Sequence, residues 1–229
     1  MKVFGKNVFN ELKENVKSIK KVYIAKNFTD KEIIKFIQDN KISYAVMDAH
    51  KMDGMVEGRH QGIIAVIDDY EYSDYRDMLN DNIVVMLDHL EDPHNFGAII
   101  RTCEALGIDA IIIPNDRNVN INGTVVKTSV GAIYNMPIVR VVNLNNTIEK
   151  LKDIGYWIIG TDMVGTDYTK IDYNMPICLV IGNEGKGMSR LVRENCDFIA
   201  MIDMVGKVNS LNASVSCGIV LSEIVSKRV

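Results

Sequence analysis

Short apolar runs alternate with helix-like segments along most of this chain, and this alternation constrains its fold more than any other feature. The runs IVVML (83–87) and CLVIG (178–182) are apolar at every position apart from one glycine. A strand that is apolar on both faces is typical of a parallel sheet covered by helices on both sides. Segments such as LNNTIEKLKDIG (144–155) lie between the runs and have helical spacing. Residues 83–229 are therefore predicted to form an α/β domain with a parallel sheet.

The first 67 residues repeat this alternation on a smaller scale, and residues 1–67 are predicted to form a separate α/β domain. KNVFNELKENVK (6–17) and TDKEIIKFIQDN (29–40) have the spacing of amphipathic helices, and Thr29 is the expected N-cap of the second. Runs with the composition of strands, such as KVYIA, lie between them. The acidic segment 68–82 has neither period and is predicted to be a linker.

Charge is distributed unevenly along the chain, although the formal net charge is only −4. Residues 1–60 contain 12 Lys and Arg against 8 Asp and Glu, whereas residues 61–82 contain 1 against 6. A net negative charge is not the usual profile of an obligate nucleic-acid binder, but a basic N-terminal part can contact a phosphate backbone. An ordinary solvated surface would give the same imbalance.

The cysteines, histidines and apolar runs are typical of a cytoplasmic protein with neither a metal site nor a membrane segment. The cysteines have no C-x-x-C spacing and lie in apolar segments, so they are expected to be reduced, buried thiols. The four histidines form no H-E-x-x-H pattern, and no metal site is predicted. The longest apolar runs are far too short to span a bilayer, and the N-terminus lacks the apolar segment of a secretory signal.

A glycine-rich turn with an acidic side chain follows the run at 178–182. The segment GNEGKGMS (182–189) places three glycines around Glu184. Its spacing is neither that of a Walker A loop nor that of a dinucleotide-binding fingerprint, and a carboxylate would repel the phosphates that such loops bind. A loop that allows close backbone approach and carries a carboxylate suits a nucleoside without phosphate, such as S-adenosylmethionine with its positive sulfonium. Glycine clusters are also common in turns that bind nothing.

Two further segments place polar side chains where a ligand could meet them. In DPHNFGAIIR (92–101), Asn95 is expected at a helix N-cap after a buried strand, and Arg101 lies about one and a half turns further along. In GKVNSLNAS (206–214), Ser210 and Asn212 open the predicted last helix. The carboxyl ends of parallel strands form the usual ligand-binding edge of such a sheet. A plain cap for Asn95 and a surface ion pair for Arg101 are the alternatives.

In this order and spacing, the patterns N-x-G-x-x-x-R, G-N-E-G-x-G and S-L-N-x-S resemble the three motifs of the SpoU (TrmH) family. These are RNA ribose 2′-O-methyltransferases of the SPOUT superfamily. The resemblance covers about residues 83–229. Residues 1–67, with FGKNVFNEL and EGRHQGIIAVI, look like the ribosomal-protein-L30e-like substrate-binding domain of the members that methylate 23S rRNA.

The resemblance implies a SPOUT domain with a deep C-terminal trefoil knot, a homodimer, and S-adenosylmethionine as the cofactor. Asp203 stands where the family usually has proline, which predicts a less rigid loop. Carried over by motif, the functional polar residues are Asn95, Arg101, Glu184, Ser210 and Asn212, and the backbone of Gly182, Ile202 and Leu211 would hold the adenosine part.

The reaction that the resemblance implies is methylation of the ribose 2′-hydroxyl of a guanosine in 23S rRNA. The alternatives are a 2′-O-methyltransferase acting on tRNA or on another rRNA site, and a non-catalytic RNA-binding factor of ribosome assembly. Glu184 is expected to help order Asn95 or the incoming ribose. Arg101 has two candidate roles, general base or anchor for a neighbouring phosphate, and the high pKa of a guanidinium group favours the anchor.

Overall fold

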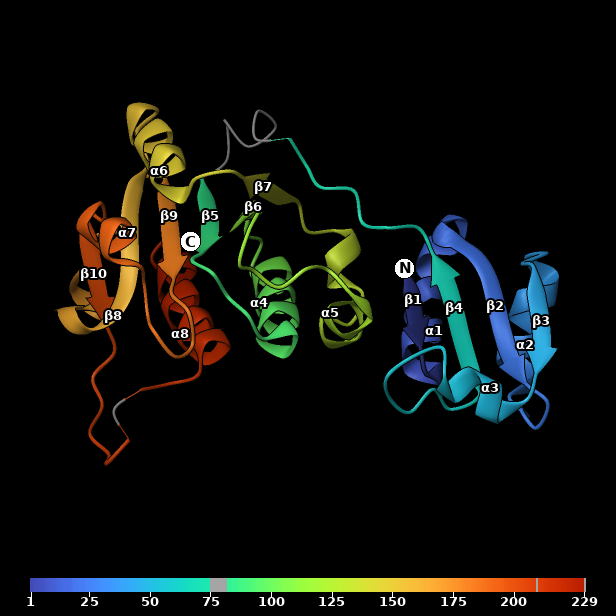
Figure 1. The fold of residues 1–229 in the computed structure, drawn as a ribbon. Helices are drawn as coiled ribbons and strands as arrows, with labels where there is room; N and C mark the ends of the chain where they lie inside the picture. The colour runs from blue at the N-terminus through green and yellow to red at the C-terminus, as the bar shows by residue number, and fades with distance from the viewer. Residues whose placement is uncertain (75–81, 209, 229) are drawn as a thin grey trace. The chain divides into compact units, whose positions relative to one another are not determined.

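The computed structural model describes residues 1–74, 82–208 and 210–228, and it divides the chain into two compact units (Figure 1). The first unit comprises Met1–Glu71 together with Ile121–Gly131. The second comprises Tyr72–Asn120 and Ala132–Val229. The segment 68–82, predicted to be a linker, lies in part outside the described residues.

The first unit is built on a four-stranded mixed sheet in the order β1-β4-β2-β3. Strands β2 and β3 are parallel, and the other two pairs are antiparallel. Helix α5, from the middle of the sequence, packs against β1. The strands are β1 (Lys2–Phe4), β2 (Ile19–Ala25), β3 (Tyr44–Met47) and β4 (Ile63–Ile67), and the helices are α1 (Lys6–Leu12), α2 (Lys31–Asp39), α3 (Ala49–Asp53) and α5 (Gly123–Thr128).

Two local expectations for this unit need correction. The N-cap of α2 is Asp30, whose carboxylate accepts a hydrogen bond from the Ile33 amide at 3.3 Å, and not Thr29. The first helix ends at Leu12 and continues as a 3-10 helix to Ser18, because Asn15 leaves the helical conformation. Strand β1 and helix α3 are too short to give a periodic pattern, and the sequence did not indicate them.

The second unit contains a six-stranded sheet in the order β10-β8-β9-β5-β6-β7, and every neighbouring pair is parallel. The predicted parallel-sheet α/β fold class is therefore confirmed. The strands are β5 (Ile83–Leu87), β6 (Ala110–Pro114), β7 (Ile138–Val141), β8 (Trp157–Asp167), β9 (Ile177–Ile181) and β10 (Phe198–Met201).

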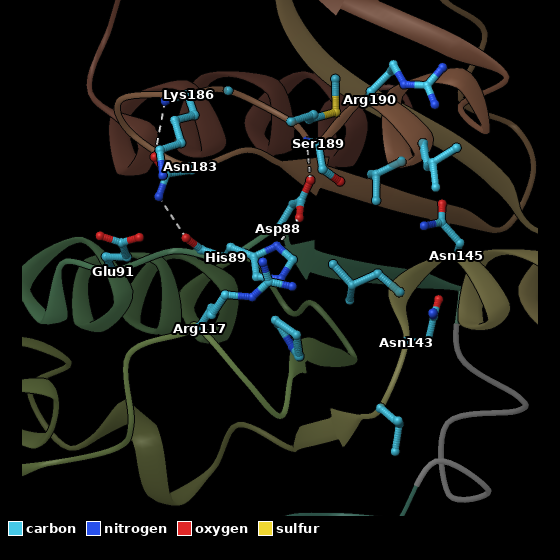
Figure 2. Close-up of a pocket in the computed structure, with 17 residues that line it drawn as sticks. Asp88, His89, Glu91, Arg117, Asn143, Asn145, Asn183, Lys186, Ser189 and Arg190 are labelled. Atoms are coloured by element: carbon cyan, nitrogen blue, oxygen red, sulfur yellow. Dashed lines mark hydrogen bonds and ion pairs between the residues drawn. The ribbon is translucent and has the colours of Figure 1, made fainter.

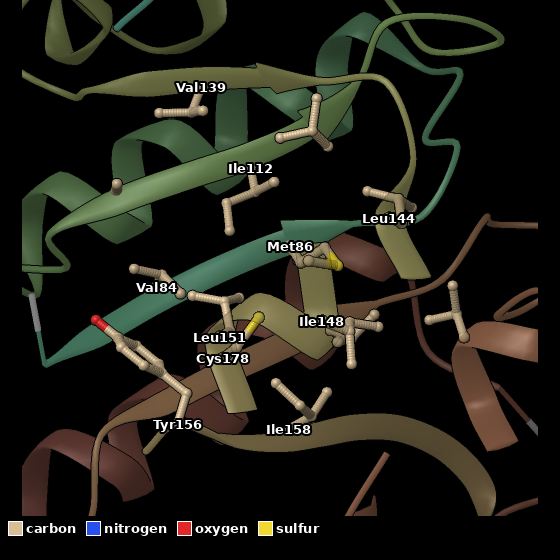
Figure 3. Close-up of a cluster of buried hydrophobic side chains, with 14 of the residues drawn as sticks. Val84, Met86, Ile112, Val139, Leu144, Ile148, Leu151, Tyr156, Ile158 and Cys178 are labelled. Carbon is tan, nitrogen blue, oxygen red and sulfur yellow. The ribbon is translucent and has the colours of Figure 1, made fainter. Parts of the chain in front are cut away.

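Helices cover both faces of this sheet, as the two-sided apolar strands predict. Helices α4 (Pro93–Ala105) and α8 (Ala213–Ser226) pack on one another, and α6 (Leu144–Asp153) packs on α7 (Arg190–Glu194). Figure 3 shows the cluster in which Ile148 and Leu151 of α6 meet alternate residues of five strands. Burying each such Leu or Ile contributes about 1.5–3 kcal/mol, so this face is a major source of stability.

Strand β8 is longer than the sequence indicates, and the extra length shapes the site. The apolar run YWIIG ends at Gly160, but β8 continues to Asp167. Gly160 pairs with Ile199 of β10, and the next residue of β10 pairs with Thr166, so residues 161–165 bulge out of the ladder.

Of two other expectations for the second half of the chain, one is wrong and one stays a prediction. The single helix expected around TVVKTSVGAI is wrong, because Val130 and Gly131 have φ angles of 51° and 78°, which end helical geometry after α5. The trefoil knot that the resemblance implies stays a prediction.

Candidate active site

The glycine-rich loop after β9 has a backbone that only glycine can form at Gly182. A Cβ at this position would lie 2.4 Å from the carbonyl carbon of Gly187 and 2.4 Å from the amide nitrogen of Met188. The loop doubles back because the Asn183 amide donates to the Gly187 carbonyl at 3.0 Å, and the Gly187 amide donates to the Asn183 carbonyl at 2.9 Å. Glycine is therefore required at position 182 because the backbone of residues 187 and 188 passes too close for a side chain.

Asn183 organises the rest of this loop and links it to the end of β5. Its Oδ1 accepts from the amides of Gly185 at 3.0 Å and Lys186 at 3.1 Å, and its Nδ2 donates to the His89 carbonyl at 2.8 Å (Figure 2). Asn183 was not among the site residues predicted from the sequence. Its place directly after Gly182 in a glycine-rich turn is the available signal, since asparagine often bonds to backbone amides two or three residues on.

Asn95 lies inside the first turn of α4 and is not its N-cap, which corrects the expectation from the sequence. The cap is Asp92, whose carboxylate accepts from the His94 amide at 2.9 Å, and Pro93 occupies the first helical position. Since it is not needed as a cap, the Asn95 side chain is available for a different contact. It is 6% exposed.

Asn95, Glu184 and Asn212 form one hydrogen-bonded chain across three distant segments. The Asn95 Nδ2 donates to Glu184 Oε1 at 3.1 Å, and Asn212 Nδ2 donates to Asn95 Oδ1 at 2.8 Å. The same Glu184 oxygen accepts from the Asp92 amide at 3.3 Å. The two ends of the Asn95 amide are thus both used, which fixes its orientation, and the carboxylate of Glu184 is held at the start of α4.

Asn212 has two roles at once, because it is also the N-cap of α8. Its Oδ1 accepts from the Ser214 amide at 2.9 Å and from the Ser214 hydroxyl at 2.6 Å, while its Nδ2 reaches Asn95. Capping satisfies one of the free amides at the helix start. The sequence indicated that capping could explain only one of the two polar residues at this helix start, and Asn212 is that residue.

A pocket of about 360 Å³ lies beside this chain of hydrogen bonds. This volume is within the range of about 300–1,000 Å³ typical of small-molecule sites. The pocket is lined by the bulged residues of β8, by the glycine-rich loop and by the segment after β10. The start of α8 forms its remaining side. Five of the residues selected from the sequence line it: Gly182, Glu184, Ile202, Ser210 and Leu211.

Asp162, on the bulge of β8, adds a second carboxylate to the pocket wall. Burial acts to raise its pKa, but hydrogen bonds from the Arg193 side chain, at 2.8 Å, and from the Met163 amide outweigh burial and hold the pKa below its usual value. Asp162 could not be selected from the sequence, since the apolar run of β8 stops at Gly160. With Glu184, it gives the pocket wall two carboxylates, of which Asp162 is paired with Arg193.

Of the selected residues, Arg101 alone belongs neither to the pocket lining nor to the hydrogen-bonded chain of Asn95, Glu184 and Asn212. It lies on α4, is exposed, and has no hydrogen-bond or ion-pair partner within the part of the chain that the structure describes. The alternative of a surface ion pair for Arg101 therefore has no support among these residues. Its guanidinium is available for a group outside its own chain.

Across residues 1–74, 82–208 and 210–228, no group of three or more His, Cys, Asp or Glu side chains could hold a metal ion. No helix in these ranges is both long and apolar enough to cross a membrane.

Two family models match the chain in consecutive ranges. Residues 2–73 match the model for RNA 2′-O ribose methyltransferase substrate binding. Residues 82–222 match the model of the SpoU rRNA Methylase family.

Relatives of known family cover most of the chain. A TrmH family protein from Staphylococcus saprophyticus, from a group of tRNA/rRNA methyltransferases, is 49% identical over 205 residues, which is 86% of this chain and 82% of that protein. A TrmH family protein from Bacillus subtilis, from the same group, is 41% identical over 237 residues, which is 99% of this chain and 95% of that protein.

Solved structures share the fold of the whole chain. The SpoU methyltransferase AviRb from Streptomyces viridochromogenes, in complex with AdoMet, superposes with a TM-score of 0.81 at 23% identity, over 100% of this chain and 90% of that one. The A. aeolicus TrmH/SpoU tRNA modifying enzyme is 31% identical and has a TM-score of 0.60, over 67% of this chain and 80% of that one. Because a family model and close relatives both span the greater part of it, this chain belongs to the SpoU (TrmH) family of RNA 2′-O-ribose methyltransferases.

Proposed function

We propose that this protein transfers the methyl group of S-adenosylmethionine to the ribose 2′-hydroxyl of a guanosine in 23S rRNA. The observation that carries the proposal is the hydrogen-bonded chain of Asn95, Glu184 and Asn212 beside a pocket lined by the other motif residues. All three motifs contribute to one site, as a working enzyme of this family requires. Such an enzyme would act in the cytoplasm, where its rRNA substrate is found.

The pocket fits the cofactor by its chemistry. Gly182 brings the loop backbone close, and Ile202 and Leu211 supply apolar surface for an adenine. Asp162 and Glu184 are carboxylates, which disfavour a phosphate but are compatible with a positive sulfonium or ammonium group. When bound, the cofactor supplies an activated methyl group with its own leaving group.

The protein's own residues then have to position the ribose and make its hydroxyl more acidic. Ser210 is exposed in the pocket and can hydrogen-bond the 2′-hydroxyl. Arg101 is an improbable base because guanidinium stays protonated in proteins. We assign it the role of a fork that binds the phosphate next to the target ribose, where its charge lowers the pKa of the hydroxyl.

A homodimer is part of the proposal, and an exposed apolar surface supports it. Met163 and Val164 of the β8 bulge, Val205 and Val208 of the segment after β10, and Val215 of α8 are all exposed. Large exposed apolar side chains on neighbouring segments around the pocket are the kind of surface that interfaces use. Because Arg101 does not line the pocket of its own chain, we propose that it serves the pocket of the second copy.

The first unit would select the RNA. It matches a substrate-binding family model, and its basic side chains suit contact with a phosphate backbone. Lys6 and Lys20 already pair with Asp30 and Asp68, so Lys2 and Lys21 are better candidates for this contact. Sequence in RNA is read mainly in loops and splayed bases, which is how a single guanosine could be chosen.

The direct test is transfer of a labelled methyl group to unmodified 23S rRNA transcript, with the product mapped by its resistance to alkaline cleavage. We expect one protected guanosine with the natural protein and none with Arg101→Ala. Transfer to tRNA or to another rRNA site alone would keep the chemistry and overturn the choice of substrate. Cofactor binding without transfer to any RNA or to immature ribosomal particles would favour the assembly-factor alternative.

A mixing experiment tests the shared site. Arg101→Ala and Glu184→Ala should each be inactive, but co-refolded mixtures should regain about a quarter of the natural activity, because half of the dimers are mixed and each has one intact site. If each pocket used only its own chain's residues, the mixture would stay as inactive as its components. Arg101→Lys should keep partial activity if the role is attraction of a phosphate.

A further inference from the structure

A second and larger pocket, of about 610 Å³, lies on the other side of the glycine-rich loop (Figure 2). It is formed by the segments that follow β5, β6, β7 and β9, so it sits at the carboxyl edge of the sheet. From β5 the chain leads to β6 and β7 on one side, and β9 lies on the other side of β5. A crevice at such a point of reversal is where open α/β sheets usually bind ligands.

Two residues of this pocket adopt a backbone conformation that side chains rarely take. His89, after β5, has a φ angle of 60°, and Arg117, after β6, has a φ angle of 52°. Residues other than glycine with positive φ are uncommon, and they concentrate at functional sites. Glycine at either position would adopt this conformation without strain. The sequence nevertheless has a histidine and an arginine there, which points to a use for the two side chains.

Hydrogen bonds hold the walls of this pocket in place. Asp88 is 1% exposed, and its two oxygens accept from the Ser189 amide and from Nδ1 of His89, each at 2.5 Å. This contact orients the His89 ring and joins the end of β5 to the loop after β9. The segment that carries Arg117 is tied on both sides, by the amide of Asn115 to Val141 and by the amide of Val119 to Leu90.

The charges in this pocket favour an anion. Arg117, Lys186 and Arg190 line it, together with the carboxylates of Asp88 and Glu91. The three cations outnumber the two carboxylates, and both oxygens of Asp88 already accept hydrogen bonds from the pocket wall. Within the described residues, Arg117 and Lys186 have no ion-pair partner, and Arg190 has only an exposed pair with Glu194 at 3.2 Å. Exposed pairs of this kind are weak and easily exchanged.

We propose that this second pocket binds a backbone phosphate of the substrate RNA, next to the nucleotide that enters the cofactor pocket. The geometry supports this, because Asn183, Lys186, Gly187 and Met188 line both pockets, so the loop would have the cofactor on one side and RNA on the other. Arg117 offers a planar fork that matches a phosphate. The inference rests on the proposed function in taking RNA as the substrate.

The test compares Arg117→Ala, Arg190→Ala and the double variant with Lys170→Ala as a control. Lys170 is an exposed lysine, paired with Asp167, that does not line the pocket. The full-length proteins are titrated with unmodified 23S rRNA transcript at several salt concentrations, and cofactor affinity is measured separately. Because neither arginine lines the cofactor pocket, its affinity should be unchanged. Each single variant should weaken RNA binding about 5- to 10-fold and lower the salt slope by about one.

The conservative variant and the separate readouts make each outcome decisive. Arg117→Lys should recover part of the RNA affinity, since it keeps the charge but loses the fork. RNA affinity and salt slope equal to those of Lys170→Ala would overturn the inference, as would a loss of cofactor binding in the double variant, which would show a structural role. Weakened RNA binding in a protein that methylates no RNA would support this pocket and refute the proposed function.

Discussion

Two glycines of the same loop give a matched test of whether this backbone builds the cofactor pocket. At Gly182 an added Cβ would lie 2.4 Å from the backbone of residues 187 and 188, whereas at Gly185 its nearest neighbour would be the Asn183 side chain at 3.7 Å. The first distance is about 1 Å short of ordinary contact, and backbone cannot move aside as a side chain can. Gly185 also has no positive φ angle, so alanine fits there without strain.

We expect Gly182→Ala to lower the free energy of unfolding by about 1–3 kcal/mol, the usual cost of overpacking, and Gly185→Ala to change it by less than about 0.5 kcal/mol. For a domain of this size, 1 kcal/mol shifts the melting temperature by about 2–4 °C. Opening the loop would also displace Glu184, so S-adenosylmethionine should bind Gly182→Ala at least about 10-fold more weakly.

The measurements are thermal unfolding followed by circular dichroism and cofactor titration by calorimetry. Equal affinities for the two alanine variants would refute the role of the loop in the pocket. A destabilised Gly182→Ala with unchanged cofactor affinity would show that the close approach serves folding alone.

Three further predictions concern the same unit. Asn212→Ala should lower the free energy of unfolding in urea by about 2–4 kcal/mol, because it removes the cap of α8 and leaves Asn95 Oδ1 without its donor. Asn212→Asp should keep the cap and lower the free energy of unfolding by less. Equal losses in the two variants would contradict this separation of the two contacts. Hydrogen bonding holds the folded-state pKa of Asp162 below its ordinary value of 3.8, so its contribution to stability is complete above that pH and is lost as the pH falls through the folded pKa. Urea unfolding between about pH 2 and pH 5 should show a steeper loss of stability below about pH 4 in the natural protein than in Asp162→Asn. Burial, with a smaller effect of Asp197, raises the pKa of the Cys196 thiol to about 12. A thiol reagent should therefore label Cys196 at pH 8 only after the protein is unfolded. Rapid labelling of Cys196 in the folded protein would contradict this, because it would show that the side chain is accessible.

The sheet could be predicted from the sequence because its strands leave a strong local signal. IVVML and ICLVI are apolar on both faces, and each forms a fully buried strand in the structure. The bulge of β8 left no such signal, since residues 161–165 are mostly polar or small and their conformation depends on pairing with β10, far along the chain. Local pattern therefore identified the strands and missed the irregularity that lines the pocket.

The motif residues could be selected from the sequence, but their contacts could not. Asn95 was expected to be a helix cap because it follows a strand and precedes a helix, yet Asp92 is favoured as the cap since it lies one residue before Pro93. That Asn95 instead lies between Glu184 and Asn212 depends on residues 89 and 117 positions away. Such long-range contacts have no local pattern.

The same long-range contacts bear on how the protein is made. During synthesis the glycine-rich loop leaves the ribosome before Asn212 does, so the loop lacks the partner of Asn95 until α8 has emerged. A nascent chain that stops short of α8 would contain most of the pocket wall, and its Asn95 amide would have Glu184 as a partner but not Asn212. The second hydrogen bond of the Asn95 amide therefore forms only after the last helix has been made, so the orientation of this side chain is completed late in synthesis.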